Sequence, residues 1–386
     1  MDFDEVVGAK RVIVCVGSGG VGKTTMSAAI ALRAAQSGRR VCVLTIDPAK
    51  RLANAMGLDA LGSAATRVEN ARFDAAGIDR PAGQLWAMML DTQRAWDSLV
   101  SRFATSKAQA ERIFANQYYQ QISSALAGSQ EFMAMEKLYE LHGSGEYDLV
   151  VLDTPPTRHA LDFLDAPKKM MGLVDERVLK LFLTPTTMAG KLGLGFLQST
   201  SGWMLRALQS ITGFDVLTEI SDFVDSFGGM YAGFSDRASA VEALLRAGGS
   251  TFLLVTSPNP STVDEAKYFH GKLVEYRIPF GGFVVNRVHP DALNEPGAKE
   301  AWQRIASEPA RLLQAVDMPE DPGLASRMAE NLARLQALAR LDAAQINRLK
   351  ALCPGPHLWR IVPAFELDVH DLSGLSRVNQ HLFSNG

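Results

Sequence analysis

A glycine-rich stretch near the start of the sequence constrains the fold more than any other feature. Five β-favouring residues at 12–16 lead into Gly17-x-x-x-x-Gly22-Lys23-Thr24, and a helix-forming run follows at 26–36. A strand, this spacing and a helix in that order are typical of a phosphate-binding P-loop. The alternative is a glycine-rich turn that binds no ligand, which leaves the complete pattern and both of its flanks unexplained.

The residue types of this stretch suit a nucleoside triphosphate. Glycines allow successive backbone N–H groups to point into one concavity, and the helix adds its positive amino-terminal end. Lys23 supplies a mobile charge for the β- and γ-phosphates, and Thr24 supplies a hydroxyl for Mg²⁺. The sequence therefore predicts a site for a nucleoside triphosphate and its magnesium ion.

Composition and charge exclude several classes of protein. The 386 residues suffice for two or three domains, or for one large α/β domain with insertions. Hydrophobic residues make up 47%, and the net charge of −3 gives no reason to expect nucleic acid as a partner. No apolar stretch approaches the roughly 20 residues that span a bilayer, and the amino terminus lacks the apolar core of a signal peptide. We expect a cytoplasmic protein without a transmembrane segment, and peripheral membrane association stays open.

The cysteines indicate neither disulfides nor a metal cluster. Cys15, Cys42 and Cys353 are too far apart for a CxxC motif or a metal-binding group. Cys15 and Cys42 fall in apolar strand-like runs, where small buried thiols are expected. The sequence thus indicates no zinc and no iron–sulfur cluster, which fits a reducing compartment.

Strand and helix signals alternate along most of the chain. Strands are expected at 12–16, 41–46, 148–153, 250–256, 281–285 and 357–362. Helices are expected at 23–37, 262–276 and 372–383, with two or three more within 92–141 and a helical stretch at 298–352 that breaks near Pro319 and Pro322. This alternation predicts an α/β fold with a doubly wound, mostly parallel sheet and an inserted α-helical subdomain.

Two aspartates stand where such a sheet binds its ligands. Asp47 follows the second predicted strand, and Asp153 ends the third. Ligands lie beyond the carboxyl ends of the strands, so both carboxylates are expected at the same edge as the P-loop. Asp153 is typical of a Walker B element, which holds Mg²⁺ through water. The alternative for Asp47 is a capping residue before Pro48. The alternative for Asp153 is a cap of the turn that follows it.

A long apolar segment interrupts the alternation. Between residues 178 and 213 the only charged side chains are Lys180, Lys191 and Arg206, and half of the 14 methionines lie between Met133 and Met230. Flexible, Met-rich apolar surface suits a site for varied hydrophobic ligands. A helical subdomain with a large core, or a dimer contact, would have the same composition.

These patterns predict a nucleotide-binding domain with two helical inserts. The domain comprises residues 1–91, then 143–164 with the Walker B element and a second switch, and then 248–386 with the carboxyl-terminal helices. The inserts are residues 92–142 and the apolar, Met-rich residues 165–247.

Several motifs together resemble those of one family of ATPases. The chain resembles the arsenical-pump and tail-anchored-protein-targeting ATPases in four motifs. These are the pair Gly19-Gly20, the threonine pair after Lys23, LTIDPA at 44–49 and LDTPPT at 152–157. These ATPases belong to the SIMIBI class of P-loop proteins. VVNR at 284–287 is similar to the family's adenine-contacting strand end, and VPAFELDV at 362–369 to its nucleotide-covering loop.

The resemblance implies a role for each matching residue, with ATP or ADP and Mg²⁺ as cofactors. Lys23 and Asp47 would be catalytic, and Asp47 would orient the attacking water. Thr24 would bind Mg²⁺ directly, and Asp153 and Asp47 would bind it through water. The residues that would contact the nucleotide are Gly19, Gly20, Val21, Gly22, Lys23, Thr24, Thr25, Asn286, Arg287, Pro363 and Phe365. A turn asparagine is the alternative for Asn286.

The chain departs from the family pattern in ways that bear on function. The family's P-loop has a lysine, which reaches the partner's phosphates across a dimer, where this chain has Ser18. Charge compensation would then come from a partner chain or from the switch cations Lys50, Arg51 and Arg158. The chain also lacks the CxxC of the zinc-clasped homodimers, the arsenite-binding cysteines and a second P-loop, so an arsenite-pump role is disfavoured.

We therefore expect an ATP-dependent switch that couples its nucleotide state to a hydrophobic client or partner protein. It would work as a homodimer or as a heterodimer with a related ATPase, and a hydrophobic client segment would bind at 165–247. The alternative is a nucleotide-bound structural subunit of a hetero-oligomer that hydrolyses poorly. A role as a DNA-partitioning ATPase is the least favoured function, because the chain is mildly acidic.

Overall fold

The computed structural model describes residues 2–47, 50–117, 119–120, 123, 129–155, 230–294, 296–307 and 322–383. Its centre is an eight-stranded sheet with the order β3-β4-β2-β5-β1-β6-β7-β8. The strands are β1 (Val12–Val16), β2 (Arg40–Thr45), β3 (Thr66–Arg67), β4 (Gln84–Met89), β5 (Leu149–Asp153), β6 (Ser250–Thr256), β7 (Phe280–Val288) and β8 (Trp359–Pro363). Among these strands only one pairing is antiparallel, that of β3 with β4. The predicted mostly parallel α/β sheet is confirmed.

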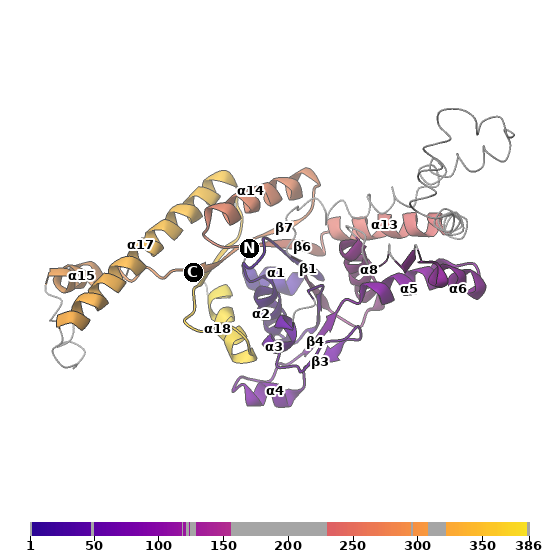
Figure 1. Ribbon diagram of the computed structural model, residues 1–386, viewed down its shortest axis with the longest axis horizontal. Helices are drawn as coiled ribbons and strands as arrows, with labels where there is room; N and C mark the ends of the chain where they lie inside the picture. Colours follow the sequence, from indigo (N-terminus) through magenta and orange to yellow (C-terminus); the bar gives the residue numbers. More distant parts are fainter. Residues whose placement is uncertain are drawn as a thin grey trace, which may run out of the picture.

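Helices cover both faces of the sheet (Figure 1). The face that carries the P-loop helix is packed by α1 (Phe3–Ala9), α2 (Lys23–Gln36), α3 (Arg51–Ala55), α4 (Asn70–Ala75) and α18 (Leu372–Leu382). The opposite face is packed by α5 (Thr92–Phe103), α6 (Lys107–Ala115), α8 (Ser129–Ser144), α13 (Tyr231–Arg246), α14 (Pro260–Glu275) and the end of α17 (Pro322–Leu352). The remaining described helix, α15 (Ala298–Ser307), lies near the far end of α17 in Figure 1.

The strand sequences explain this two-sided packing. All five residues of β1 are buried, because a parallel sheet with helices on both faces shields each side of every central strand. Side chains alternate along the strand, so Val12, Val14 and Val16 join one core, while Ile13 and Cys15 join the other. The three cysteines are buried free thiols.

The end of β7 differs from the sequence-based expectation. The strand was expected at 281–285 with Asn286 and Arg287 after it, but β7 continues to Val288. It continues because β8 pairs with it as far as Val288 and Pro363, across a register shift. Arg287 has a positive φ of 62°, which marks the irregularity and turns its side chain outward. Strands β3 and β4 and helices α1 and α4 were not predicted at all.

Several sequence-based expectations lie outside the described residues. These are the whole of 178–213, the switch cation Arg158 and the break near Pro319. Of the Met-rich insert at 165–247, the structure describes only Met230 and the residues after it, with α13. The proposed domain boundaries therefore remain predictions. No described helix has the length and apolar character needed to cross a membrane.

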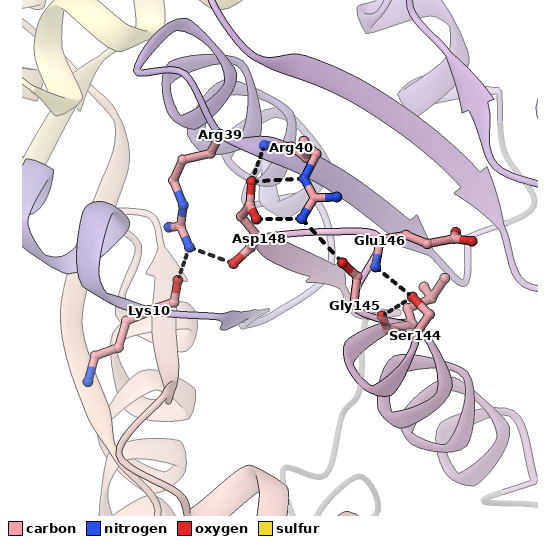
Figure 2. A network of polar contacts seen from close by, with 8 residues as sticks. Lys10, Arg39, Arg40, Ser144, Gly145, Glu146 and Asp148 are labelled. Atoms are coloured by element: carbon pink, nitrogen blue, oxygen red, sulfur yellow. Dashed lines mark hydrogen bonds and ion pairs between the residues drawn. The ribbon is translucent and has the colours of Figure 1, made fainter.

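A cluster of polar contacts ties the amino-terminal ends of β1, β2 and β5 (Figure 2). The Arg39 guanidinium donates to the carbonyl oxygens of Lys10 at 2.7 Å and Asp148 at 2.5 Å, and also to that of Val7. Its neighbour Arg40 pairs with the Asp148 carboxylate at 2.8 Å, and these hydrogen bonds lower the pKa of Asp148 to about 2. Because Arg39, just before β2, reaches carbonyls of the segments that precede β1 and β5, we infer that it fixes the spacing of the three strand ends.

We predict that Arg39→Lys lowers the free energy of unfolding by about 1–2 kcal/mol, because an ammonium group cannot reproduce the forked contacts of a guanidinium. Urea unfolding at pH 7 measures the change. The matched control is Arg40→Lys, whose more exposed ion pair should change stability much less. Equal losses in the two variants would contradict this role of Arg39.

Candidate functional site

The P-loop connects the end of β1 to the start of α2, and two of its glycines are required by close approach. A Cβ on Gly17 would lie 2.0 Å from the carbonyl oxygen of Val255, and one on Gly22 would lie 2.3 Å from Nδ2 of Asn286. Both glycines have positive φ values, of 149° and 95°. Helix α2 begins at Lys23, so its amino-terminal N–H groups face the loop.

The charge of Lys23 is held inside this loop. The side chain is buried, and its ammonium group donates to the carbonyl oxygens of Gly17 at 2.9 Å and Ser18 at 2.8 Å. Burial lowers the pKa of Lys23, and the negative charges of Asp153 and Asp47 oppose that shift. A cation in this position can approach the phosphates of a bound nucleotide.

Asp153 is the central polar group of the site. It ends β5 and is 1% exposed, and its Oδ2 accepts hydrogen bonds from the hydroxyl of Thr24 at 2.7 Å and from that of Thr45 at 2.9 Å. The Thr45 hydroxyl in turn accepts from the backbone N–H of Asp47 at 3.2 Å. Strand register creates this arrangement, because Asp153 pairs with Thr45 on one side and Cys15 on the other.

The donor set of this cluster fits a magnesium ion. The second carboxylate oxygen of Asp153 is buried without a hydrogen-bond partner among the described residues. Hydroxyl and carboxylate oxygens are the ligands that Mg²⁺ prefers, and it commonly takes one or two from the protein and the rest from water and phosphates. The described residues contain no group of three or more His, Cys, Asp or Glu side chains that could hold a metal by themselves. Thr24 and Asp153 are the residues that would hold the ion, which would neutralise phosphate charge when bound.

One pocket of about 890 Å³ brings together all of the predicted nucleotide contacts. It is lined by Gly19, Gly20, Val21, Gly22, Lys23, Thr24, Thr25, Asp47, Arg51, Asn286, Arg287, Pro363 and Phe365. Asp153 does not line it but lies beneath Thr24. Lys50 is exposed and not part of the lining, and Arg158 lies outside the described residues.

Asn286 connects the two halves of the pocket. Its side chain is buried, and its amide donates to the carbonyl oxygen of Val21 at 2.8 Å. The backbone of the covering loop is attached to the same strand, since Ala364 N–H donates to the Val288 carbonyl at 2.9 Å. These hydrogen bonds therefore fix the phosphate-binding end of the pocket relative to its β7–β8 end.

Ser18 stands beside an acid rather than a cation. Its hydroxyl donates a hydrogen bond to the carboxylate of Glu265, which projects from α14. Of the two predicted charge-compensating cations that the structure describes, Lys50 and Arg51, only Arg51 lines the pocket. Its positive charge also contributes to lowering the pKa of Lys23, which indicates that the two cations are close.

Sequence reasoning missed several residues of the pocket. Ser257, Pro258 and Asn259 follow β6, and His289 follows β7, so the rule that ligands lie at the carboxyl ends of strands could have found them. Asp342 comes from the middle of α17, and no signal in the sequence connects it to this edge.

A P-loop between β1 and α2, with a buried aspartate at the end of the adjacent parallel strand, defines a P-loop nucleotide-binding protein. The family model described as anion-transporting ATPase matches residues 10–317, well over half of the chain. The chain therefore belongs to the anion-transporting ATPase family, and this membership makes it an ATPase.

Curated relatives agree with this assignment. The chain is 27% identical over 305 residues to an ATPase ASNA1 homolog of Cryptosporidium parvum, covering 79% of this chain and 72% of the relative. It is 32% identical over 167 residues to a putative arsenical pump-driving ATPase of Halobacterium salinarum, covering 43% and 25%. It is 31% identical over 156 residues to the ATPase GET3 of Malassezia globosa, covering 40% and 42%. The last two alignments thus span less than half of those relatives.

The burial of Asp153 predicts how stability depends on pH in protein free of nucleotide and metal. Desolvation raises the pKa of Asp153 from its ordinary 3.8 to about 6, although hydrogen bonds from Thr24 and Thr45 oppose the shift. The folded state thus binds this proton more tightly than the unfolded state, so stability is lost as the pH rises from about 4 through about 6. The loss should approach about 3 kcal/mol.

Asp153→Asn should remove that loss, because an amide stays neutral. Chemical unfolding in EDTA between pH 4 and pH 8 measures the difference. Asp148→Asn is the matched control, because the lowered pKa of Asp148 contributes stability with the opposite sign, present above about pH 4 and lost towards pH 2. The same pH dependence in wild type and Asp153→Asn would contradict the assigned cause.

Proposed function

We propose that the chain is an ATP-driven switch that couples nucleotide state to the binding of a hydrophobic client or partner protein. The observation that supports this most is the hydrogen bonding of Asp153 to both Thr24 and Thr45. Thr24 belongs to the P-loop, and Thr45 ends β2 two residues before Asp47. A ligand that changes the partners of Asp153 would act on the segments after β2 and β5 at once.

The roles that we propose follow from the demands of phosphoryl transfer, which needs positioned charge rather than a covalent nucleophile. Lys23 binds the β- and γ-phosphates, and Thr24 ligates Mg²⁺ directly. Asp153 and Asp47 bind Mg²⁺ through water, and Asp47 orients the attacking water. The base lies at the other end of the pocket, near Asn286, Arg287, Pro363 and Phe365.

Arg51 is the cation that we propose for charge compensation within the chain. It lines the pocket, and it follows Asp47 in the same segment after β2. Lys50 and Arg158 remain further candidates, and a related ATPase subunit in a homodimer or heterodimer could supply a cation instead. Such a contribution is worth factors of about 10³–10⁵ in rate in other phosphoryl-transfer enzymes.

The client site that we propose is the Met-rich insert at 165–247, which follows the Walker B strand in the sequence. Strand β5 ends at Asp153, and after residue 155 the described residues resume at Met230, just before α13. Helix α13 is anchored by Arg237, whose guanidinium pairs with the buried carboxylate of Glu136 on α8 at 2.6 Å. In the part of the chain that the structure describes, the last helix of the insert, α13, is thus fixed to α8.

A second candidate function is a structural subunit that retains nucleotide and hydrolyses it poorly. The hydrogen bond between Ser18 and Glu265 favours it, because it places an acid where a compensating cation would help. A turnover measurement separates the two functions.

We predict that Asp47→Asn lowers kcat for ATP by about 100-fold or more, with the Kd for Mg·ATP changed by less than about threefold, because the amide cannot orient water in the same way. Steady-state phosphate release and equilibrium titration give the two quantities. Asp59→Asn is the control, since Asp59 is an exposed acid of the same segment. Unchanged turnover in Asp47→Asn would reject the assigned acid, and absence of turnover in the wild type with tight ATP binding would favour the structural subunit.

A further inference from the structure

A histidine–aspartate pair stands at the β7 end of the nucleotide pocket. His289 follows β7, and its Nδ1 lies 2.8 Å from Oδ2 of Asp342, which also accepts the backbone N–H of His289 at 2.8 Å. The Asp342 side chain is 9% exposed and that of His289 is 33% exposed. Both residues line the pocket. The imidazole is thus held on one side by a buried acid and faces the pocket with the rest of its ring.

Helix α17 fixes this pair at two points. Besides Asp342, it contributes Gln336, whose amide donates to the carboxylate of Asp291 at 2.5 Å. The same Asp291 oxygen accepts the backbone N–H of Leu293 at 2.9 Å, which closes the turn after His289. The ring position is therefore set before any ligand binds, as a specificity contact requires.

The acid determines which ring nitrogen carries the proton. A carboxylate at Nδ1 favours the tautomer that has its hydrogen on Nδ1, which leaves Nε2 as a hydrogen-bond acceptor. Within the described residues Nε2 has no hydrogen-bond partner. The pair lies next to the covering loop, because Val288, the residue before His289, accepts the N–H of Ala364. An acceptor is thus presented to the pocket beside the covering loop.

We propose that Nε2 of His289, held by Asp342, accepts a hydrogen bond from the 6-amino group of adenine and thereby selects adenine over guanine nucleotides. Guanine carries an oxygen at that position, so two acceptors would face each other and both would stay unpaired. This inference rests on the proposed nucleotide site and adds a specificity-determining residue to it, with Asp342 as a positioning residue.

The test compares Mg²⁺ complexes of ATP, GTP and purine riboside triphosphate, which lacks the 6-amino group, by isothermal titration calorimetry. The wild type should bind ATP roughly tenfold more tightly than either analogue, the effect expected for one hydrogen bond. His289→Phe should bind ATP and purine riboside triphosphate equally, and Asp342→Asn should reduce the ratio of their affinities. The control is His142→Phe on α8, outside the lining of this pocket, which should keep the wild-type ratio.

The ratio of affinities separates base recognition from a structural role. An unchanged ratio in His289→Phe overturns the inference, and so does an equal loss of affinity for all three nucleotides. Thermal melting shows which variants fold. If His289→Phe does not fold, the ratio of affinities in Asp342→Asn tests the inference instead. Failure of the wild type to bind ATP any better than Lys23→Ala does would instead reject the nucleotide site itself.

Discussion

The hydrogen bonds that Thr24 and Thr45 donate to the buried carboxylate of Asp153 hold together the edge of the sheet where ligands bind. They join the P-loop to the carboxyl ends of β2 and β5, and the Thr154 hydroxyl adds to this connection by donating to the Cys15 carbonyl at 2.8 Å. Burying a carboxylate is costly, and desolvation raises the pKa of Asp153 although Lys23 and the two hydroxyls oppose the shift. A magnesium ion bound at this site would relieve that cost.

Charge balance around the pocket follows from the same constraint. Lys23 is the buried cation that partly compensates Asp153 and Asp47, and Arg51 adds a second positive charge from the segment after β2. Ser18 brings no charge, and Glu265 next to it adds a negative one at the outer side of the loop. We propose that these charges bind phosphates, and that the charge needed in the transition state comes from Arg51, from the other candidates Lys50 and Arg158, or from a second chain.

The sequence was sufficient to predict the P-loop, the parallel sheet and the position of Asp153, because each depends on local pattern and on one rule about strand ends. It could not predict that β7 extends past Asn286, since that depends on pairing with β8 about 75 residues later, a non-local contact. Short edge strands such as β3 carry too little pattern to recognise. Asp342 illustrates the same limit, because only the packing of α17 brings it beside His289.

The central claim is that Asp153 and its threonine partners transmit the nucleotide state to the segments after β2 and β5. Hydrogen exchange with and without a Mg²⁺-bound, non-hydrolysable ATP analogue tests it most directly, in the wild type and in Thr45→Val, which keeps the shape of the side chain and removes its hydroxyl. We predict that the analogue slows exchange of the amides around Asp47 and Thr154 in the wild type, but only that of the P-loop amides in Thr45→Val. Equal slowing of both segments in the two proteins would contradict the claim.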